Sequence, residues 1–532
     1  MPIFCLKIGA PKQLQKKMYQ EIEITTLPEE VQDLGIIRRK ALDKSGWKKI
    51  DHLHVRKRSI DARQRKIVYR LRVQIYLDEL PPKDTLLLPS LPDVNGKKTV
   101  VVIGAGPAGY FAALELIEQG LKPIIFERGH SVQNRRKSLR DIQQFGIVDP
   151  DSNYCFGEGG AGTYSDGKLY TRSHKRGKIA KVLQLLVEHG AHPDILVDAH
   201  PHIGSNKLPR IIQAIRETIE RHGGEVHFES KMTDLIIQNK EIQGVIINGT
   251  DEILCQQVIL ATGHSARDIY LLLAQKKVKI EAKPFALGVR LEHPQPIIDE
   301  IQYKQKNRSE NLPAASYNIS CQVEKRGVFS FCMCPGGLIV PAATAPGEIV
   351  VNGMSLSRRD SPFANSGFVT EIRLTDLHEN ILDNPLSGME FQQKIEQKVF
   401  DAGEGTQKAP AQRLTDFVEG KLSPSLPDSS YIPGLLSRRV DELLPDFVTQ
   451  HLRQGLKTFK KKMPTYYTQE ANVVAVESRT SSPVRIPRDR ETYQHIEIKG
   501  LYPCAEGAGY AGGIVSAALD GQNVAKAIAV AK

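Results

Sequence analysis

Hydrophobic and polar positions alternate along this chain in three distinct ways. Val100–Ile103 and Ile124–Phe126 are short, continuous apolar runs, as expected of strands buried on both faces. Residues 67–77 and 226–254 alternate between apolar and polar side chains, which predicts half-buried antiparallel strands. Apolar positions with helical spacing predict helices near 107–119, 206–222, 388–401, 435–444, 446–462 and 513–531. The chain is therefore predicted to be α/β.

The first apolar run leads directly into a glycine-rich turn and a helix. Gly104 permits the tight turn, Gly106 lets the backbone approach a pyrophosphate, and Gly109 lets the helix pack closely on the strand. Unpaired N–H groups at the helix N-terminus favour phosphate. Glu127 ends the next apolar run, where a carboxylate can bind a ribose diol. The order of strand, glycines, helix, second strand and acid argues against a chance glycine turn and predicts a dinucleotide-binding unit. The predicted contacts of this unit are Gly104, Ala105, Gly106, Pro107, Ala108, Gly109, Glu127 and Arg128.

The later part of the chain selects between FAD and NAD. A strand at 258–260 ends in an Ala-Thr-Gly turn, and Glu506-Gly507 precedes an alanine-rich helix that starts near Gly513. In flavoproteins of the glutathione-reductase superfamily, an acid followed by glycine holds the ribityl chain or phosphates, and the next helix stabilises the reduced flavin. An ordinary doubly wound domain without flavin is the alternative. We expect FAD, with contacts from Ala261, Thr262, Gly263, Glu506, Gly507, Gly512, Gly513 and Ile514.

These segments predict a domain order in which one domain interrupts another. Residues 1–90 are expected to form a basic α+β domain and linker, and 99–282 the first part of a Rossmann-like FAD-binding domain. Residues 283–475 form an inserted α+β substrate domain, a β-sheet followed by helices, and 476–532 complete the FAD-binding domain. This order places the flavin at a domain interface, a favoured location for a substrate cleft.

Charge and hydropathy change this picture only at the N-terminal end. The 532 residues carry a formal net charge of +11, but residues 1–98 alone hold 21 Lys/Arg against 12 Asp/Glu. Arg70 and Arg72 share one face of a predicted strand, so this surface could bind RNA, an acidic protein or phosphates, although a well-solvated hairpin is favoured. No signal peptide or long apolar segment is evident, and we expect a cytoplasmic enzyme without a membrane partner.

The seven cysteines lack any Cys-x-x-Cys spacing. This argues against a disulfide scaffold, a tetrathiolate zinc site and the dithiol relay of disulfide reductases, and no metal site is predicted. Cys332 and Cys334 would point the same way on a strand. A metal pair, a redox pair and plain packing remain open, and packing is favoured.

Four longer motifs carry a resemblance that covers essentially the whole chain. They are Phe156–Leu169, Phe331–Gly337, Glu477–Ile486 and Tyr502–Gly513. Together they resemble a bacterial family of FAD-dependent dehydrogenases, often described as NAD(P)-utilising, of unassigned substrate. The N-terminal Ser59–Arg63 also resembles that family's appended domain, so the basic surface need not signal a separate function.

Two of these motifs supply further candidate site residues. Residues 157–162 follow no apolar strand, so they predict a flavin-contacting loop rather than a second dinucleotide turn, with a surface turn as the alternative. Lys168 would place a cation near the reduced flavin. His200, His202 and His264 are weak acid–base candidates. The predicted cofactor contacts are Gly159, Gly160, Gly162, Thr163 and Lys168, and the predicted substrate contacts are Arg479, Ser481, Ser482 and Arg485.

The resulting expectation is an FAD oxidoreductase that passes hydride between NADH or NADPH, the flavin and an unidentified small organic substrate. No separate NAD(P)H-binding unit is evident, so the donor would bind transiently at the flavin, or electrons would come from elsewhere. A flavin-dependent tRNA-modifying enzyme that uses the basic N-terminal domain is the first alternative, and a non-catalytic flavin-bearing interaction protein is the second. The acid–base residue and the oligomeric state are not assigned by the sequence.

Overall fold

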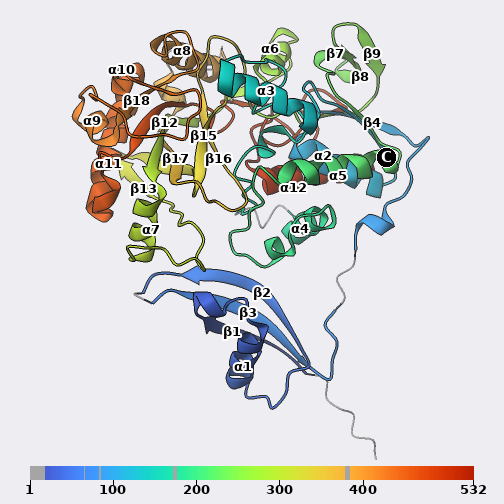
Figure 1. The fold of residues 1–532 in the computed structure, drawn as a ribbon. Helices are drawn as coiled ribbons and strands as arrows, with labels where there is room; N and C mark the ends of the chain where they lie inside the picture. Colours follow the sequence, from blue (N-terminus) through green and yellow to red (C-terminus); the bar gives the residue numbers. More distant parts are fainter. Residues whose placement is uncertain (1–17, 65, 83–85, 172–176, 378–383, 532) are drawn as a thin grey trace, which may run out of the picture. The chain divides into compact units, whose positions relative to one another are not determined.

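The computed structural model describes residues 18–531 apart from 65, 83–85, 172–176 and 378–383. Cys5 and the rest of residues 1–17, which belong to the predicted N-terminal domain, lie outside the described residues. The chain divides into two units. The first runs to Thr85 and includes Leu196–Ala199, and the second contains the remainder (Figure 1). Each unit is described separately.

The first unit is a three-stranded antiparallel sheet with one helix on it. The strand order is β1 (Met18–Thr26), β3 (Val68–Leu77) and β2 (His52–Asp61), and α1 (Leu34–Ser45) packs on β1. Alternate residues such as Leu71, Val73 and Ile75 are buried, as the alternating pattern predicts. The helix begins at Leu34 because the Asp33 carboxylate caps it, accepting hydrogen bonds from the N–H groups of Gly35 and Ile36.

The other face of this sheet carries charges of both signs. Arg70 lies 3.1 Å from Glu23 and 2.8 Å from Asp61, and Arg72 lies 3.6 Å from Glu21. Cross-strand pairs of this kind place opposite charges side by side. The predicted basic surface is therefore locally balanced by acidic neighbours rather than uniformly positive.

The second unit contains a five-stranded parallel sheet, which confirms the predicted α/β fold with buried parallel strands. Helices and a meander cover its two faces and bury both, so its strands are apolar throughout. One face packs on α2 (Pro107–Glu118), α5 (Leu208–Arg221) and α12 (Ile514–Val530), and the other on α6 (Arg267–Gln275) and the meander β7 (Met232–Gln238), β8 (Glu241–Ile247) and β9 (Asp251–Leu254). The strand order is β22 (Leu501–Pro503), β10 (Val258–Leu260), β4 (Thr99–Ile103), β5 (Lys122–Phe126) and β6 (Glu225–His227).

A seven-stranded mixed sheet forms the other half of this unit, and its strands come from residues 285–477. Helix α11 (Asp446–Lys462) packs on four of them, and α8 (Ser387–Ala402) packs on two others (Figure 1). The strand order is β13 (Ser320–Val323), β14 (Arg326–Cys334), β17 (Phe363–Ile372), β12 (Phe285–Pro294), β20 (Asn472–Glu477), β18 (Ala409–Arg413) and β19 (Leu435–Ser437).

One predicted helix in this region is wrong. Residues 435–444 begin with the strand β19, which pairs in parallel with β18, and only Val440–Leu443 is helical, as α10. Sheet pairing takes these apolar residues because Ala409–Ala411 offers a free edge, a long-range effect that helical spacing alone cannot show.

Shorter elements complete the unit. The hairpin β15 (Gly337–Pro341) and β16 (Val351–Ser355) lies against the large sheet, and β11 (Glu281–Ala282) pairs with β21 (Val484–Arg485). The remaining helices are α3 (Val132–Phe145), α4 (Ile179–Glu188), α7 (Gln295–Tyr303) and α9 (Leu414–Glu419). Within the described residues, no helix has the length and apolar character needed to cross a bilayer.

Candidate cofactor and substrate site

A cavity of about 280 Å³ lies at the carboxyl ends of the parallel strands. Turns that follow β4, β5, β10 and β22 line it on one side, and residues of the mixed sheet and the β15–β16 hairpin line it on the other. The carboxyl edge of an open α/β sheet is where such folds bind ligands. The fold thus joins segments that lie roughly 400 residues apart in the sequence, from Gly104 to Ala517.

The glycine turn after β4 has the geometry that the sequence predicts. Gly104 has φ +103°, and a Cβ there would lie 2.6 Å from the carbonyl oxygen of Ala261. A Cβ on Gly109 would lie 2.0 Å from the carbonyl oxygen of Gly104. Gly106 differs, because the nearest described atom to its Cβ position is the Cα of Gly160 at 3.9 Å. Gly106 therefore leaves space in the cavity at the N-terminus of α2 that a phosphate group could fill.

The Glu127 carboxylate organises the turns on this side. It accepts hydrogen bonds from the N–H groups of Ala105 at 2.8 Å, Gly129 at 3.0 Å and Gly157 at 2.9 Å, and it lines the cavity. Arg128 also lines the cavity, and its guanidinium forms an ion pair of 2.8 Å with Asp268. Glu127 thus connects the glycine turn, its own strand end and the loop that starts at Gly157.

That loop is held by Arg135, a residue that the sequence analysis missed. Its buried guanidinium donates hydrogen bonds to the carbonyl groups of Asn153 at 2.8 Å, and of Glu158 and Gly160 at 2.9 Å. Gly160 and Gly162 line the cavity. The available signal was an arginine on the apolar face of α3, together with Leu139 and Ile142.

Two predicted contacts of this loop lie behind the cavity wall. The Thr163 hydroxyl is buried and donates to the carbonyl of Glu158 at 3.2 Å, and Gly159 sits in the left-handed turn at φ +78°. Neither residue lines the cavity. Their binding to the cofactor stays a prediction, while their structural role is to shape the loop.

Glu506 occupies the N-terminus of α12. Its carboxylate accepts a hydrogen bond from the N–H of Gly513 at 2.6 Å and lies 3.1 Å from Nδ1 of His264. Burial alone would raise the pKa of Glu506, but the His264 contact more than offsets this and the pKa is lowered. The other ring nitrogen of His264 lies 3.1 Å from the Arg479 carbonyl oxygen. The glutamate and His264 therefore link the predicted cofactor turns to the segment that begins at β20.

The remaining predicted residues of these turns form two groups, those that line the cavity and those that do not. Those that line the cavity are Pro107, Ala108, Ala261, Thr262, Gly263, Gly513 and Ile514. Those outside its lining are Ala105, Gly109, Gly507 and Gly512. Gly507 has a structural reason, because a Cβ there would lie 2.8 Å from the Gly263 carbonyl oxygen.

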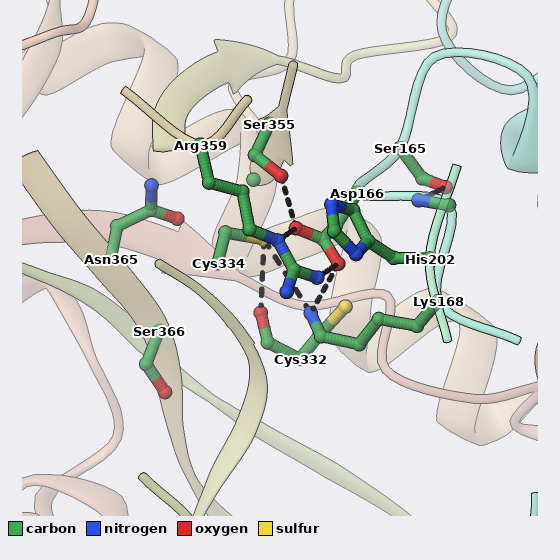
Figure 2. Close-up of polar contacts among 12 residues, drawn as sticks. Ser165, Asp166, Lys168, His202, Cys332, Cys334, Ser355, Arg359, Asn365 and Ser366 are labelled. Atoms are coloured by element: carbon green, nitrogen blue, oxygen red, sulfur yellow. Dashed lines mark hydrogen bonds and ion pairs between the residues drawn. The ribbon is translucent and has the colours of Figure 1, made fainter. Parts of the chain in front are cut away.

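The far end of the cavity is polar, and it centres on Lys168 (Figure 2). The Lys168 ammonium lies 3.4 Å from the Asp166 carboxylate and 3.8 Å from Sγ of Cys334. Asp166 is buried and also accepts hydrogen bonds from Ser355 and Arg359. Burial opposes its ionisation, but the charges of Lys168 and Arg359 lower the pKa of Asp166 to about 2. The ionised aspartate holds Lys168 in place as a cation.

A buried ion pair stands beside this cluster. Arg290 donates to Glu477 at 2.6 Å, to Asn365 at 2.8 Å and to the carbonyl of Cys332 at 2.9 Å. Burial raises the pKa of Glu477 to about 7, although the Arg290 charge opposes the shift. Since Glu477 lines the cavity, the site contains a carboxyl group that titrates near neutral pH.

Of the predicted substrate contacts, Arg479 alone lines the cavity. Its buried guanidinium forms ion pairs of 2.9 Å with both Glu348 and Glu396, which balance its charge. Ser482 is buried in a turn, where its hydroxyl accepts from the N–H of Val484. Ser481 and Arg485 also lie outside the cavity lining. Substrate binding by these residues stays a prediction, and their contacts in the structure give it little support.

Two further polar residues make contacts with a structural role, His202 and Arg488. His202 lies 3.1 Å from the carbonyl oxygen of Ser357. Arg488 forms an ion pair of 2.7 Å with Asp520, and both side chains are largely buried.

Family models match three parts of the chain. A model for an FAD binding domain matches residues 99–136, and one described as FAD-dependent protein, C-terminal domain-like, matches residues 284–480. A model for a domain of unknown function (DUF8436) matches residues 18–76. The first two include the glycine turn and most of the mixed sheet, so both sides of the cavity fall within matched segments.

The chain is similar over most of its length to one further protein and, at low identity, to solved structures. An uncharacterized protein from Clostridium beijerinckii is 40% identical over 520 residues, which cover 93% of this chain and 96% of that protein. Among solved structures, tetracycline destructase Tet(51) aligns with a TM-score of 0.34 and 11% identity over 82% of this chain and 83% of that chain. L-proline dehydrogenase from P. horikoshii aligns with a TM-score of 0.32 and 13% identity over 83% and 95% of the two chains.

The fold, the cavity and the family models define an FAD-dependent enzyme. The chain belongs to the same family as the Clostridium beijerinckii protein, a family of FAD-dependent proteins. FAD is its cofactor, as predicted from the sequence. The residues present fit this group: the open position at Gly106, two helix N-termini that face one cavity, and carboxylates at Glu127 and Glu506.

Proposed function

We propose that the protein is an FAD-dependent oxidoreductase that moves hydride between a small organic substrate and its flavin, with NADH or NADPH as the second redox partner. The observation that carries this proposal is the continuity of the cavity. It runs from the glycine turn at Gly106 to a polar end with Lys168, Cys332 and Glu477. A cofactor site and a place for chemistry therefore share one cavity.

The near end of the cavity supplies the groups that suit FAD. The first turn of α2 and the loop at Gly160–Gly162 suit the pyrophosphate, and Glu127 suits a ribose. Glu506 and the N-terminus of α12 suit the ribityl chain and the flavin ring. Bound FAD supplies the acceptance and donation of a hydride equivalent, which amino-acid side chains do not provide.

The far end supplies charge and a titratable proton. Lys168 contributes a positive charge that Asp166 keeps in place, and this charge can stabilise an anionic group on a substrate. Glu477 has one oxygen hydrogen bonded to Arg290 and a pKa of about 7, so its carboxyl group can hold or release a proton at neutral pH. Phe331, Val350 and Ala342 add apolar surface to the lining of the cavity.

The alternative of a tRNA-modifying enzyme has less support. It relied on an unbalanced basic surface in the N-terminal unit, and Arg70 and Arg72 there are paired with Asp61, Glu23 and Glu21. Cation–anion pairs of this kind reduce the positive potential that attracts a phosphate backbone.

The test is an anaerobic titration of the purified holoprotein with NADH and then with NADPH. The flavin absorbance band at about 450 nm is followed, since reduction bleaches it. We expect rapid bleaching by at least one nicotinamide. A yellow protein that neither donor reduces would contradict the nicotinamide-linked part of the proposal, and a protein that FAD cannot reconstitute would contradict all of it.

A further inference from the structure

Two cysteines stand side by side at the polar end of the cavity, on strand β14. Cys332 lines the cavity, while Cys334 is buried behind it (Figure 2). The pairing of β14 with β17 shifts register between Phe331 and Cys334, and Cys332 has φ +46°, an uncommon value for a residue other than glycine. Bulges of this kind re-aim side chains next to active sites. The bulge therefore presents a thiol to the cavity that a regular strand would place differently.

Two cations flank this thiol pair. The Lys168 ammonium and Nη2 of Arg290 each lie 3.8 Å from Sγ of Cys334, and Arg290 also donates to the Cys332 carbonyl. The described part of the chain contains no group of three histidine, cysteine, aspartate or glutamate side chains that could hold a metal ion. Lys168 and Arg290 are paired with Asp166 and Glu477, and they place two positive charges beside the Cys334 sulfur, where they can stabilise a thiolate in the cysteine pair.

The two thiols differ in acidity. A hydrogen bond from the Cys334 thiol lowers the pKa of Cys332 to about 5 against the effect of burial, and the charges of Lys168 and Arg290 add to the shift. The same hydrogen bond and burial raise the pKa of Cys334. The lowered pKa belongs to the cysteine that lines the cavity and the raised pKa to the buried one, which favours a thiolate at Cys332. A nucleophilic sulfur with a resolving partner is the arrangement that thiol–disulfide exchange requires.

We propose that Cys332 and Cys334 form a redox-active pair that reduces small disulfides in the cavity. The Cys332 thiolate attacks one sulfur of RS–SR, which forms a Cys332–SR bond and releases RS⁻. Sγ of Cys334 then attacks Sγ of Cys332, which forms the Cys332–Cys334 bond, and its proton leaves with the second RS⁻ as RSH. Solvent protonates the first RS⁻, so one disulfide becomes two thiols and the pair loses two electrons.

Repeated turnover of the cysteine pair rests on the proposed function, because reduced FAD must return two electrons to the Cys332–Cys334 bond. A hydride equivalent from reduced FAD carries two electrons and one proton, and its addition to the Cys332–Cys334 bond restores one thiol and one thiolate. The pair would then be an intermediate redox group between the flavin and a solution disulfide. This defines the substrate class as a disulfide small enough to enter the cavity.

The first test needs no variant. The reduced holoprotein is mixed anaerobically with bis(2-hydroxyethyl) disulfide, then denatured, alkylated and analysed by peptide mass spectrometry. A single tryptic peptide, between Arg326 and Arg358, carries both cysteines. We expect this peptide to lose both alkylation sites, while Cys155, which also lines the cavity, is still alkylated. Full alkylation of Cys332 and Cys334 after this treatment would overturn the proposal.

A variant separates the two sulfurs. In Cys334→Ser, the mixed disulfide on Cys332 cannot resolve, so the hydroxyethyl adduct should accumulate there. Cys321→Ser, on the neighbouring strand β13, is the matched control and should form the Cys332–Cys334 bond normally. An adduct that resolves equally well in Cys334→Ser would show that Cys334 is not the partner.

Reductive titration distinguishes this proposal from the proposed function. The oxidised holoprotein should take up roughly four electrons per chain, two for the flavin and two for the pair, and Cys334→Ser roughly two. Bleaching by a nicotinamide with no disulfide formed would support the proposed function and overturn the pair. A disulfide that forms while neither nicotinamide bleaches the flavin would support the pair and contradict the proposed nicotinamide linkage.

Discussion

Single glycines near the cavity have different physical reasons, and these reasons make separable predictions. Gly104 needs its left-handed backbone and has no room for a Cβ, because the Ala261 carbonyl lies 2.6 Å away. Gly106 has φ −75°, which any residue adopts, and its Cβ position faces open space in the cavity. The first glycine therefore serves the fold, and the second serves the cofactor.

This difference predicts opposite outcomes for two similar substitutions. Gly106→Ala should leave the melting temperature of the apoprotein unchanged and weaken FAD binding roughly tenfold or more, because the methyl group takes the space of a phosphate contact. Gly104→Ala should destabilise the apoprotein itself by about 1–2 kcal/mol or more. Differential scanning calorimetry and FAD titration measure the two effects. Normal FAD affinity in Gly106→Ala would remove Gly106 from the site.

Lys168 makes a prediction about the chemistry at the other end of the cavity. Lys168→Met removes a cation that favours the Cys332 thiolate, so the pKa of Cys332 should rise from about 5 toward neutral. Its alkylation by iodoacetamide at pH 6 should slow roughly tenfold for a pKa of about 7, with little change at pH 9, because the thiolate fraction at pH 6 falls from about nine-tenths to about one-tenth. The rate is followed by peptide mass spectrometry. Lys181→Met, whose lysine pairs with Glu115 on α2, is the control, and an unchanged pH profile in Lys168→Met would contradict this account.

Short sequence patterns around single residues predicted part of the site and missed the rest. The geometry of the glycines within residues 104–109 could be predicted because a pattern of only four or five neighbouring residues identifies the turn that requires them. Arg479 was predicted as a substrate contact, but its ion pairs with Glu348 and Glu396 have no local signal. Its position beside Glu348 and Glu396 depends on the packing of α8 and the β16 side of the cavity, which only the fold brings together.

Helix α3 shows how one element shapes a loop that it does not contain. Its Arg135 donates to the carbonyls of Asn153, Glu158 and Gly160, so the carbonyl groups of the loop point to α3. The N–H groups of Gly157 and Gly159 donate to Glu127 and to the Ala105 carbonyl, so the loop is fixed to the glycine turn as well. The helix thereby preorganises the second side of the cofactor site.

Arg135→Met should accordingly affect both stability and the cofactor. Loss of the guanidinium removes a hydrogen-bond donor from the buried carbonyl groups of Asn153, Glu158 and Gly160, which should cost about 1–3 kcal/mol. FAD occupancy should also fall, because the glycine loop loses its fixed conformation. Lys137→Met, an exposed position two residues along the same helix, should change neither quantity. Denaturant unfolding and flavin content are the measurements, and wild-type values in Arg135→Met would refute the role of α3.

Elements were predictable where their own pattern was decisive. The continuous apolar runs of β4 and β5 indicated parallel strands buried on both faces, and the structure confirms them. Residues 435–437 have an apolar pattern compatible with a helix, but they join the edge of β18 as a strand. Edge pairing is a tertiary effect, and the spacing of apolar residues within one segment does not report it.

The site in the second unit forms only because a late segment of the chain returns to the parallel sheet. Strand β22 adds to β10 after about 240 intervening residues, and this return brings Glu506 and α12 beside the glycine turn. The order of motifs predicted the return, because each segment ends in a turn suited to the same dinucleotide. The sequence did not predict how the mixed sheet closes the far end with Lys168, Cys332 and Glu477.

The central claim is that FAD occupies the cavity where these separated turns meet. Hydrogen–deuterium exchange of the protein with and without FAD tests it most directly, since a bound ligand slows local opening in the segments that it contacts. We predict slower exchange with FAD at 104–109, 157–168, 261–264 and 506–514, and equal exchange in β13 and α11, which lie outside the cavity lining. Protection that omits these four segments, or that falls mainly on β13 and α11, would contradict the account.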